Sequence, residues 1–223
     1  MLAKKAPMSR FFKATFFLLL LACVQSYAGV FDHPLKKEDS AGLEQVLSSM
    51  RKNPVVRGTF KQVKSVKKIN REFVSTGRFT IAGSDGIIWS MEKPFANQTA
   101  ITKKKMVQRS ASGSVSEMNV AENAVFNRIS QTIQGIFSGD FQLIQSEFQV
   151  YYEPVKGDKS LWVVGLVPKE SAIKKQIASV ELQGGAWLQN VKIVDGDGNP
   201  VTYEFSKVEG GETFTPEESA LLK

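Results

Sequence analysis

The chain has almost no cysteine or histidine. Its 223 residues include one cysteine, Cys23, and one histidine, His33. One cysteine cannot form a disulfide within the chain, and one histidine leaves little material for a His-dependent triad or a zinc site built from several histidines. The sequence also lacks a glycine-rich phosphate loop after a predicted strand and a Gly-x-Ser-x-Gly elbow. We therefore expect no catalytic residues, no metal and no cofactor, and a protein that is not an enzyme.

Long apolar runs are also scarce, and the only one lies close to the N-terminus. It covers residues 14–24 and is shorter than the stretch of about 20 apolar residues that a membrane-spanning helix needs. Small residues follow at Ser26 and Ala28, the two positions that a signal peptidase reads. A positively charged leader precedes the run and contains Lys4, Lys5, Arg10 and Lys13. This combination predicts an export signal over residues 1–28.

A second interpretation of the same segment stays open. Residues 20–23 read Leu-Leu-Ala-Cys and resemble a lipobox, the motif at which bacterial lipoproteins are cleaved and lipidated on cysteine. Cleavage after Ala28 would give a soluble exported protein, whereas lipidation of Cys23 would give a tethered one. The good match at residues 26–28 and the unusual Leu21 inside the lipobox favour the soluble form.

The basic excess of the chain is concentrated in this signal. Removing residues 1–28 takes away four basic residues and no acidic one, so the formal net charge of +7 falls to +3. A nucleic-acid partner is therefore not expected. Residues 29–223 contain no second apolar run of membrane-spanning length and are enough for one domain with a substantial core.

Two segments have the apolar spacing of amphipathic helices. The first covers residues 40–52, ends at Asn53-Pro54, and repeats apolar residues at Leu43, Val46, Leu47 and Met50. The second covers residues 122–137, with Gly139 placed to end it. Its apolar positions are Phe126, Ile129, Ile133 and Phe137. The second helix either covers a face of the sheet as a lid or completes the core.

Most of the remaining chain has the period of two that is typical of β-strands. The predicted strands are 73–81, 87–91, 99–102, 106–109, 114–120, 148–152, 161–167, 177–182, 187–194 and 201–205. They are short and follow one another with few helices between them, which favours an antiparallel arrangement. The fold class is therefore mainly β (α+β), with one strongly curved antiparallel sheet.

Two further patterns have an ordinary and a functional interpretation. Residues 195–199 read Asp-Gly-Asp-Gly-Asn, like the start of a calcium loop, but Pro200 and Ser206 stand where that loop needs glycine and glutamate. This favours a turn. Two basic runs contain Lys61, Lys64, Lys67, Lys68 and Arg71, and Lys103, Lys104, Lys105 and Arg109. They either protect strand edges from aggregation or dock to an acidic partner or an anionic membrane.

The order of these elements resembles the LolA-like family, the periplasmic carriers of outer-membrane lipoproteins in Gram-negative bacteria. After the first helix, Gly58-Thr59-Phe60-Lys61-Gln62 is similar to the opening strand of the family. Four short segments carry the resemblance, at residues 58–62, 75–79, 89–94 and 195–216. They span most of the chain after the signal.

The resemblance implies an incomplete, unclosed antiparallel β-barrel with an N-terminal helix and a mid-chain helical lid. It also implies a cavity that encloses the acyl chains of lipoproteins. The inward-facing candidates, chosen by alternation, are Phe60, Phe79, Ile81, Ile87, Trp89 and Met91 from the strands, with Phe126, Ile129, Ile133 and Phe137 from the helix.

One position departs from the family pattern. The family usually carries an Arg-Pro pair a few residues before the tryptophan, and its arginine is thought to hold the lid. The aligned positions are Gly83 and Ser84. The resemblance therefore implies a divergent member in which the lid is held in another way.

The sequence hypothesis is a monomeric periplasmic carrier that ferries lipidated or lipid-like cargo toward the outer membrane. The family implies two partners, a release machinery at the inner membrane and an acceptor at the outer membrane. Two alternatives share the fold: an outer-membrane acceptor anchored through Cys23, and a periplasmic sensor that regulates a response to lipoproteins.

Overall fold

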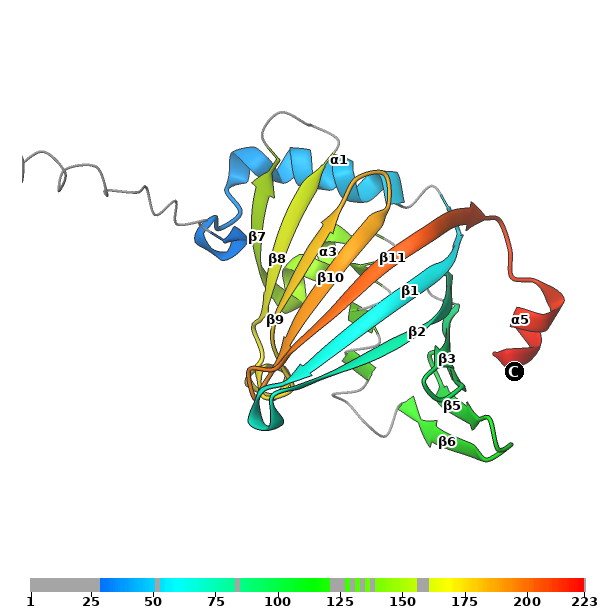
Figure 1. Ribbon diagram of the computed structural model, residues 1–223. Helices are drawn as coiled ribbons and strands as arrows, with labels where there is room; N and C mark the ends of the chain where they lie inside the picture. Colours follow the sequence, from blue (N-terminus) through cyan, green and yellow to red (C-terminus); the bar gives the residue numbers. More distant parts are fainter. Residues whose placement is uncertain are drawn as a thin grey trace, which may run out of the picture.

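The computed structural model describes residues 29–50, 53–82, 85–120, 127–128, 131–132, 135–136, 139–155 and 161–222. Eleven strands account for most of the regular structure (Figure 1). Six come from the first half of the chain: β1 (Val55–Val66), β2 (Arg71–Ala82), β3 (Gly86–Lys93), β4 (Asn97–Ile101), β5 (Lys105–Ser110) and β6 (Val115–Asn119). Five come from the second half: β7 (Phe148–Pro154), β8 (Trp162–Pro168), β9 (Ile177–Gly184), β10 (Leu188–Asp195) and β11 (Pro200–Gly211).

These strands form one antiparallel sheet in the order β6-β5-β4-β3-β2-β1-β11-β10-β9-β8-β7. Strands β6 and β7 are the two ends of this order, so the sheet is curved but not closed into a barrel (Figure 1). The predicted mainly β fold with an incomplete antiparallel barrel is therefore confirmed. One short N-terminal stretch lies beside the β7 edge, because the Leu35 amide donates to the Val150 carbonyl at 3.0 Å.

The two halves of the sheet meet where β1 pairs with β11. Phe60 lies opposite Phe205, and Gln62 lies opposite Tyr203. The register shifts between Arg57 and Thr59, which is the signature of a β-bulge that bends the strand and increases its twist. The shift lies in the strand pair that joins the two halves of the sheet.

Helix α1 (Ser40–Met50) confirms the predicted N-terminal helix. Its Leu43 and Leu47 are buried in a cluster with side chains from β7 to β10. The segment predicted as a mid-chain helix is described only in part, and its described residues are helical at 127–128, 131–132 and 135–136. Gly139 follows with φ of 63°, a left-handed conformation typical of the residue that ends a helix.

Three short helices were not predicted: α3 (Phe141–Glu147), α4 (Ser171–Lys174) and α5 (Pro216–Leu221). Each is too short for an apolar repeat to be recognised. The capping residues at the starts of α3 and α5 are the sequence signals for these helices instead. The Asp140 carboxylate accepts from the Leu143 amide at 3.1 Å, and Thr215 forms a capping box with Glu218. None of the helices formed by the described residues is long and apolar enough to cross a membrane.

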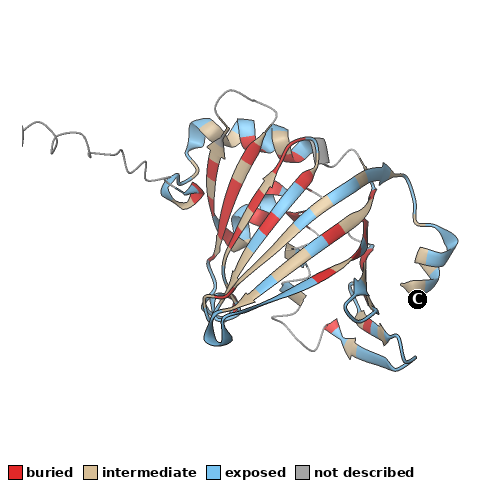
Figure 2. Ribbon diagram, viewed as in Figure 1, coloured by how far each residue is buried: buried red, intermediate tan, exposed pale blue. Residues whose placement is uncertain are grey.

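The core is unevenly divided between the two halves. The larger cluster joins α1 and α3 to β7 through β10 and includes the fully buried Trp162, Leu166 and Leu182. The smaller cluster lies at β1 to β3. Figure 2 shows the same division, with buried residues concentrated on β7 to β10 and exposed residues at the hairpin tips.

Helix α5 is attached to the outer face of the sheet by a partly buried ion pair. Arg57 of β1 donates from Nε to Glu218 Oε1 at 2.7 Å and from Nη2 to Glu218 Oε2 at 2.5 Å. Thr80 of β2 donates its hydroxyl to the same carboxylate at 2.8 Å. Arg57 and Thr80 alternate with the inward-facing Phe60 and Phe79, so this site is separate from the inner face.

Candidate functional site

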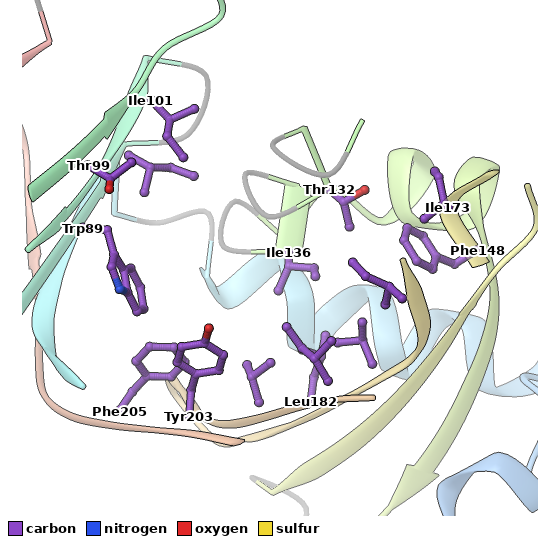
Figure 3. A pocket seen from close by; sticks show the side chains of 15 residues that line it. Trp89, Thr99, Ile101, Thr132, Ile136, Phe148, Ile173, Leu182, Tyr203 and Phe205 are labelled. Carbon is purple, nitrogen blue, oxygen red and sulfur yellow. The ribbon is translucent and has the colours of Figure 1, made fainter. Parts of the chain in front are cut away.

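The inner face of the sheet contains an apolar cavity of about 300 Å³ (Figure 3). Its volume lies at the lower end of the range of about 300–1,000 Å³ that is usual for small-molecule sites. Fifteen side chains line it: Ile87, Trp89, Thr99, Ile101, Thr132, Ile136, Phe148, Ile173, Ile177, Val180, Leu182, Val191, Ile193, Tyr203 and Phe205. None of these described residues carries a charge. The cavity therefore suits an apolar ligand, or the apolar part of a larger one.

Strand alternation produces one wall of the cavity. Successive side chains of a strand point to opposite faces, so every second residue of β3, β4, β9, β10 and β11 faces inward. Pairs from neighbouring strands then lie side by side, for example Trp89 with Thr99 and Val191 with Tyr203. The lining therefore comes from both halves of the sheet, which meet through the contacts of Trp89 with Tyr203 and Phe205.

Aromatic rings form the part of this wall that lies at the junction of the two halves. Trp89 stacks on Phe60 with ring centroids 4.1 Å apart and an interplanar angle of 24°. It meets Tyr203 and Phe205 nearly edge-on, at centroid distances of 5.7 and 6.3 Å. Such offset and edge-to-face contacts stabilise ring pairs beyond the area that they bury. This corner is a largely apolar surface made of packed rings.

The opposite wall is formed by helical residues and by the end of the sheet. Figure 3 shows Thr132 and Ile136 facing the cavity from the helical segment, with Phe148 and Ile173 beside them. Ile136 is buried, and it belongs to the same cluster as Leu43 of α1. Ile136 therefore both joins the core and lines the cavity.

The electrostatics of the cavity are those of a neutral site. Tyr203 is its one ionisable group, and burial raises the pKa of the Tyr203 phenol above its ordinary value of 10.0. The hydroxyl therefore stays neutral at physiological pH. Together with Thr99 and Thr132 it supplies hydrogen-bonding groups to a largely apolar surface, an arrangement that orients a ligand without demanding a charge on it.

The predicted cavity residues fall into four groups. Ile87 and Trp89 line the cavity. Phe60, Phe79 and Ile81 are buried in the smaller cluster, which also contains Ile87 and packs against Trp89. Met91 lies further along β3, where its sulfur accepts from Asn97 Nδ2 at 3.7 Å. Phe126, Ile129, Ile133 and Phe137 lie outside the described residues, as do Cys23 and Gly83.

Several lining residues were not predicted, and most of them come from the second half of the chain. Tyr203 and Phe205 are the clearest cases, since β11 alternates as regularly as β3. Periodicity shows which residues of a strand share a face of the sheet, but not which of those residues border the cavity. The pairing of Phe205 with Phe60 supplies that information.

The Asp195–Asn199 segment is a turn between β10 and β11, as predicted. Asp195 Oδ1 accepts from the Asn199 amide at 2.8 Å and from the Asp197 amide at 3.0 Å. These bonds hold the pKa of the Asp195 carboxyl below its ordinary value, with the bond from Asn199 as the largest cause. Across the described ranges, no group of three or more His, Cys, Asp or Glu side chains is arranged to hold a metal.

Comparison with known proteins gives one family. The sequence matches the model of the family described as outer membrane lipoprotein carrier protein LolA over residues 51–218. None of the curated proteins matches the chain significantly.

Several solved structures are similar to the chain at low identity. A DUF1329 family protein from Desulfovibrio piger has 11% identity and a TM-score of 0.47, with 82% of this chain and 98% of that chain covered. A putative outer membrane lipoprotein-sorting protein domain from Vibrio parahaemolyticus has 9% identity and a TM-score of 0.43, covering 82% and 99%. A LolA superfamily protein from Nitrosomonas europaea has 7% identity and a TM-score of 0.42, covering 80% and 95%.

Proposed function

The chain belongs to the LolA family of outer membrane lipoprotein carrier proteins, and from this premise we propose that it is a periplasmic carrier of acyl chains. In this proposal the cavity on the inner face binds the acyl chains of lipoproteins, or of a related lipid cargo, and the protein ferries them toward the outer membrane. The observation that carries the proposal is the uncharged, largely apolar lining of a cavity of about 300 Å³.

The physical requirement is a reversible replacement of the membrane interior. A lipid chain gains about 0.8 kcal/mol for each CH₂ group that it buries in a bilayer. A carrier must replace much of that burial, because water offers none of it, and must also release the cargo again. An open sheet suits both needs, since its aromatic corner at Trp89 gives contact area while the unjoined strands β6 and β7 leave a way out.

The mid-chain helix has the role of a lid in this proposal. Thr132 and Ile136 face the cavity from that segment, so a movement of the helix would change the exposure of the opposite wall. The predicted lid positions Phe126, Ile129, Ile133 and Phe137 remain part of the proposal. Because Gly83 replaces the family arginine, the apolar contacts of the helix, rather than a latch from the β2–β3 turn, would keep the lid closed.

The place of action follows from the predicted signal. Cleavage near Ala28 would release a soluble periplasmic shuttle that receives cargo from an inner-membrane release machinery and delivers it to an outer-membrane acceptor. Lipidation of Cys23 would instead make the protein a tethered acceptor. The intact mass of the protein recovered from the envelope distinguishes the two, because it gives the cleavage site and any attached lipid together.

The carrier proposal is tested by filling the cavity. Thr99 lies opposite Trp89 in the sheet and faces the cavity, so T99F places a ring in the space that an acyl chain would occupy. Binding of a fluorescent fatty acyl probe should weaken at least tenfold, since about 1.4 kcal/mol of lost burial, or two CH₂ groups, gives that factor. Filling a cavity also tends to preserve folding.

T202F is the matched control. Thr202 precedes Tyr203 in β11 and faces the opposite side of the sheet, so the same substitution should leave probe binding unchanged. Absence of probe binding by the unmodified protein, or equal binding by the unmodified protein and T99F, would overturn the assignment of the cavity as the cargo site.

A further inference from the structure

The tip of the β1–β2 hairpin combines exposed apolar and basic side chains. The two strands are joined by a short 3₁₀ turn at Lys67–Ile69 and by Asn70, which has φ of 47°. Three of the five large apolar side chains that are most exposed in the described part of the chain lie here: Ile69 at 56%, Phe73 at 50% and Val74 at 50%. We refer to residues 64–74 as the hairpin tip.

These apolar side chains point in different directions. Phe73 is paired with Lys64 and lies on the face that continues to Phe60, whereas Val74 is paired with Val63 on the other face. Ile69 lies in the turn itself. The apolar surface therefore surrounds the end of the hairpin instead of forming one flat patch.

The hairpin tip is basic as well as apolar. Lys64, Lys67, Lys68 and Arg71 are all exposed, and Glu72 is the one acidic residue between positions 64 and 74. Glu72 accepts a hydrogen bond from Ser65 at 3.0 Å. Asp195 lies close enough to Lys64 for the lysine to help lower its pKa. Lys67 and Lys68 are the two basic residues of the turn itself.

The tip is held in place by the neighbouring turn. The Lys67 amide donates to Asn199 Oδ1 at 3.1 Å, and Asn199 Nδ2 donates to Asp195 Oδ2 at 3.1 Å. Asn199 itself is buried, with 9% exposure. Figure 1 shows the hairpin tip projecting at the lower end of the sheet beside the β10–β11 turn. Its apolar groups are thus presented to solvent by a fixed scaffold.

We propose that the hairpin tip docks the protein onto an anionic lipid surface. Ile69, Phe73 and Val74 would enter the interfacial region of the bilayer, while Lys67, Lys68 and Arg71 would bind lipid phosphates around them. Interfacial binding of this kind grows with buried apolar area and with attraction to anionic lipids.

A lipid surface fits these observations better than an acidic protein. A protein partner would cover one face of the hairpin, and Val74 or Phe73 would remain in water. A bilayer surrounds the inserted end, so it can bury apolar side chains on both faces and in the turn together. The inference goes beyond cargo binding, because the tip and the cavity are distinct surfaces.

Vesicle co-flotation tests the proposal with cargo-free protein. Partitioning to vesicles of phosphatidylcholine and phosphatidylglycerol should exceed partitioning to vesicles of phosphatidylcholine alone, and it should weaken as salt is raised. The charge variant K67E/K68E should bind the anionic vesicles at least about tenfold more weakly, since each basic residue near an anionic surface contributes appreciably. The apolar variant I69S/F73S should also bind more weakly while keeping a similar salt dependence.

The charge-matched control is K103E/K104E, in the turn between β4 and β5. That turn lies at the opposite end of the strands, because Ile101 pairs with Ile87 near the start of β3. The control should retain vesicle binding. Equal losses in K67E/K68E and K103E/K104E would show that net charge alone matters and would overturn the proposal. Unchanged binding by I69S/F73S would overturn it too, because the apolar side chains would then not enter the bilayer.

The same variants keep this test separate from the carrier proposal. All four tip positions are exposed, so probe binding in the cavity and urea midpoints should match those of the unmodified protein. Vesicle binding without probe binding would refute the carrier alone, and probe binding without vesicle binding would refute the docking alone.

Discussion

Replacing Glu218 with glutamine should destabilise the protein in a pH-dependent way. Glu218 of α5 receives two hydrogen bonds from Arg57, one from the Thr80 hydroxyl and one from the Thr215 amide. The ion pair is largely shielded, with 21% of the Arg57 side chain and 15% of the Glu218 side chain exposed. In E218Q the arginine keeps its charge but loses the carboxylate that neutralises it.

The magnitude follows from the pKa of the carboxyl. The hydrogen bond from Arg57 is the largest cause that lowers the pKa of Glu218 from its ordinary value of 4.5 to about 2, and burial opposes the change. At about 1.4 kcal/mol per pKa unit, this lowering corresponds to about 3 kcal/mol of folding free energy at neutral pH. A lowered carboxyl pKa stabilises the folded state above pH 4.5, and this contribution is lost as the pH falls toward 2.

Urea unfolding of the unmodified protein and E218Q, repeated between pH 7 and pH 2, measures this contribution. The difference in unfolding free energy should be constant above about pH 5, shrink below pH 4.5, and be small near pH 2. The control is E217Q, which removes the charge of an exposed neighbour in the same helix and should change stability little. A difference of the same size at pH 3 and pH 7 would refute the reasoning, as would a Glu218 carboxyl that titrates near 4.5 by NMR.

Three further substitutions test the packing and the turns. G77A should destabilise by about 1–3 kcal/mol through overpacking, because an added Cβ would lie 2.0 Å from the Ser90 carbonyl oxygen; unchanged urea unfolding would contradict this. G42A should stabilise by about 0.5–1 kcal/mol, since a helical glycine is replaced where an added Cβ meets nothing within 4 Å; a lower melting temperature would be contrary to expectation. N199A should cost about 1–3 kcal/mol because it leaves the Lys67 amide unpaired, and faster amide exchange at Lys67 is the specific readout.

The regular part of the fold could be predicted because local patterns determine it. The apolar stripe of α1 and the alternation of β3 and β11 depend only on residues that are close in the sequence. The helices α3, α4 and α5 could not be predicted in this way, since four to seven residues give at most two turns. Their caps, Asp140 and Thr215, were the available signals.

The cavity lining could be predicted only in part because it depends on strand order. Alternation places Phe60, Ile87 and Trp89 on one face, but it does not tell which of them borders open space. Tyr203 and Phe205 enter the site because β11 pairs with β1, across more than half of the chain. In the folded sheet Trp89 stacks on Phe60, and the rings of Tyr203 and Phe205 contact Trp89.

The junction between β1 and β11 also determines when the sheet can form. Thr59 and Ser206 contact each other across 147 positions of the sequence, so the chain must close a very long loop before the central strands pair. Folds dominated by such non-local contacts form slowly. Until β11 arrives, β1 presents an unpaired edge that invites association with other chains.

Strand β11 therefore joins the two halves of the sheet, a role that no edge strand has. Loss of an edge strand such as β6 would shorten the sheet, whereas loss of β11 would divide it into the β6–β1 half and the β10–β7 half. The wall that joins Trp89 to Val191 would then no longer exist. A chain that has not yet completed its final strand thus lacks this cavity, however well its earlier strands have folded.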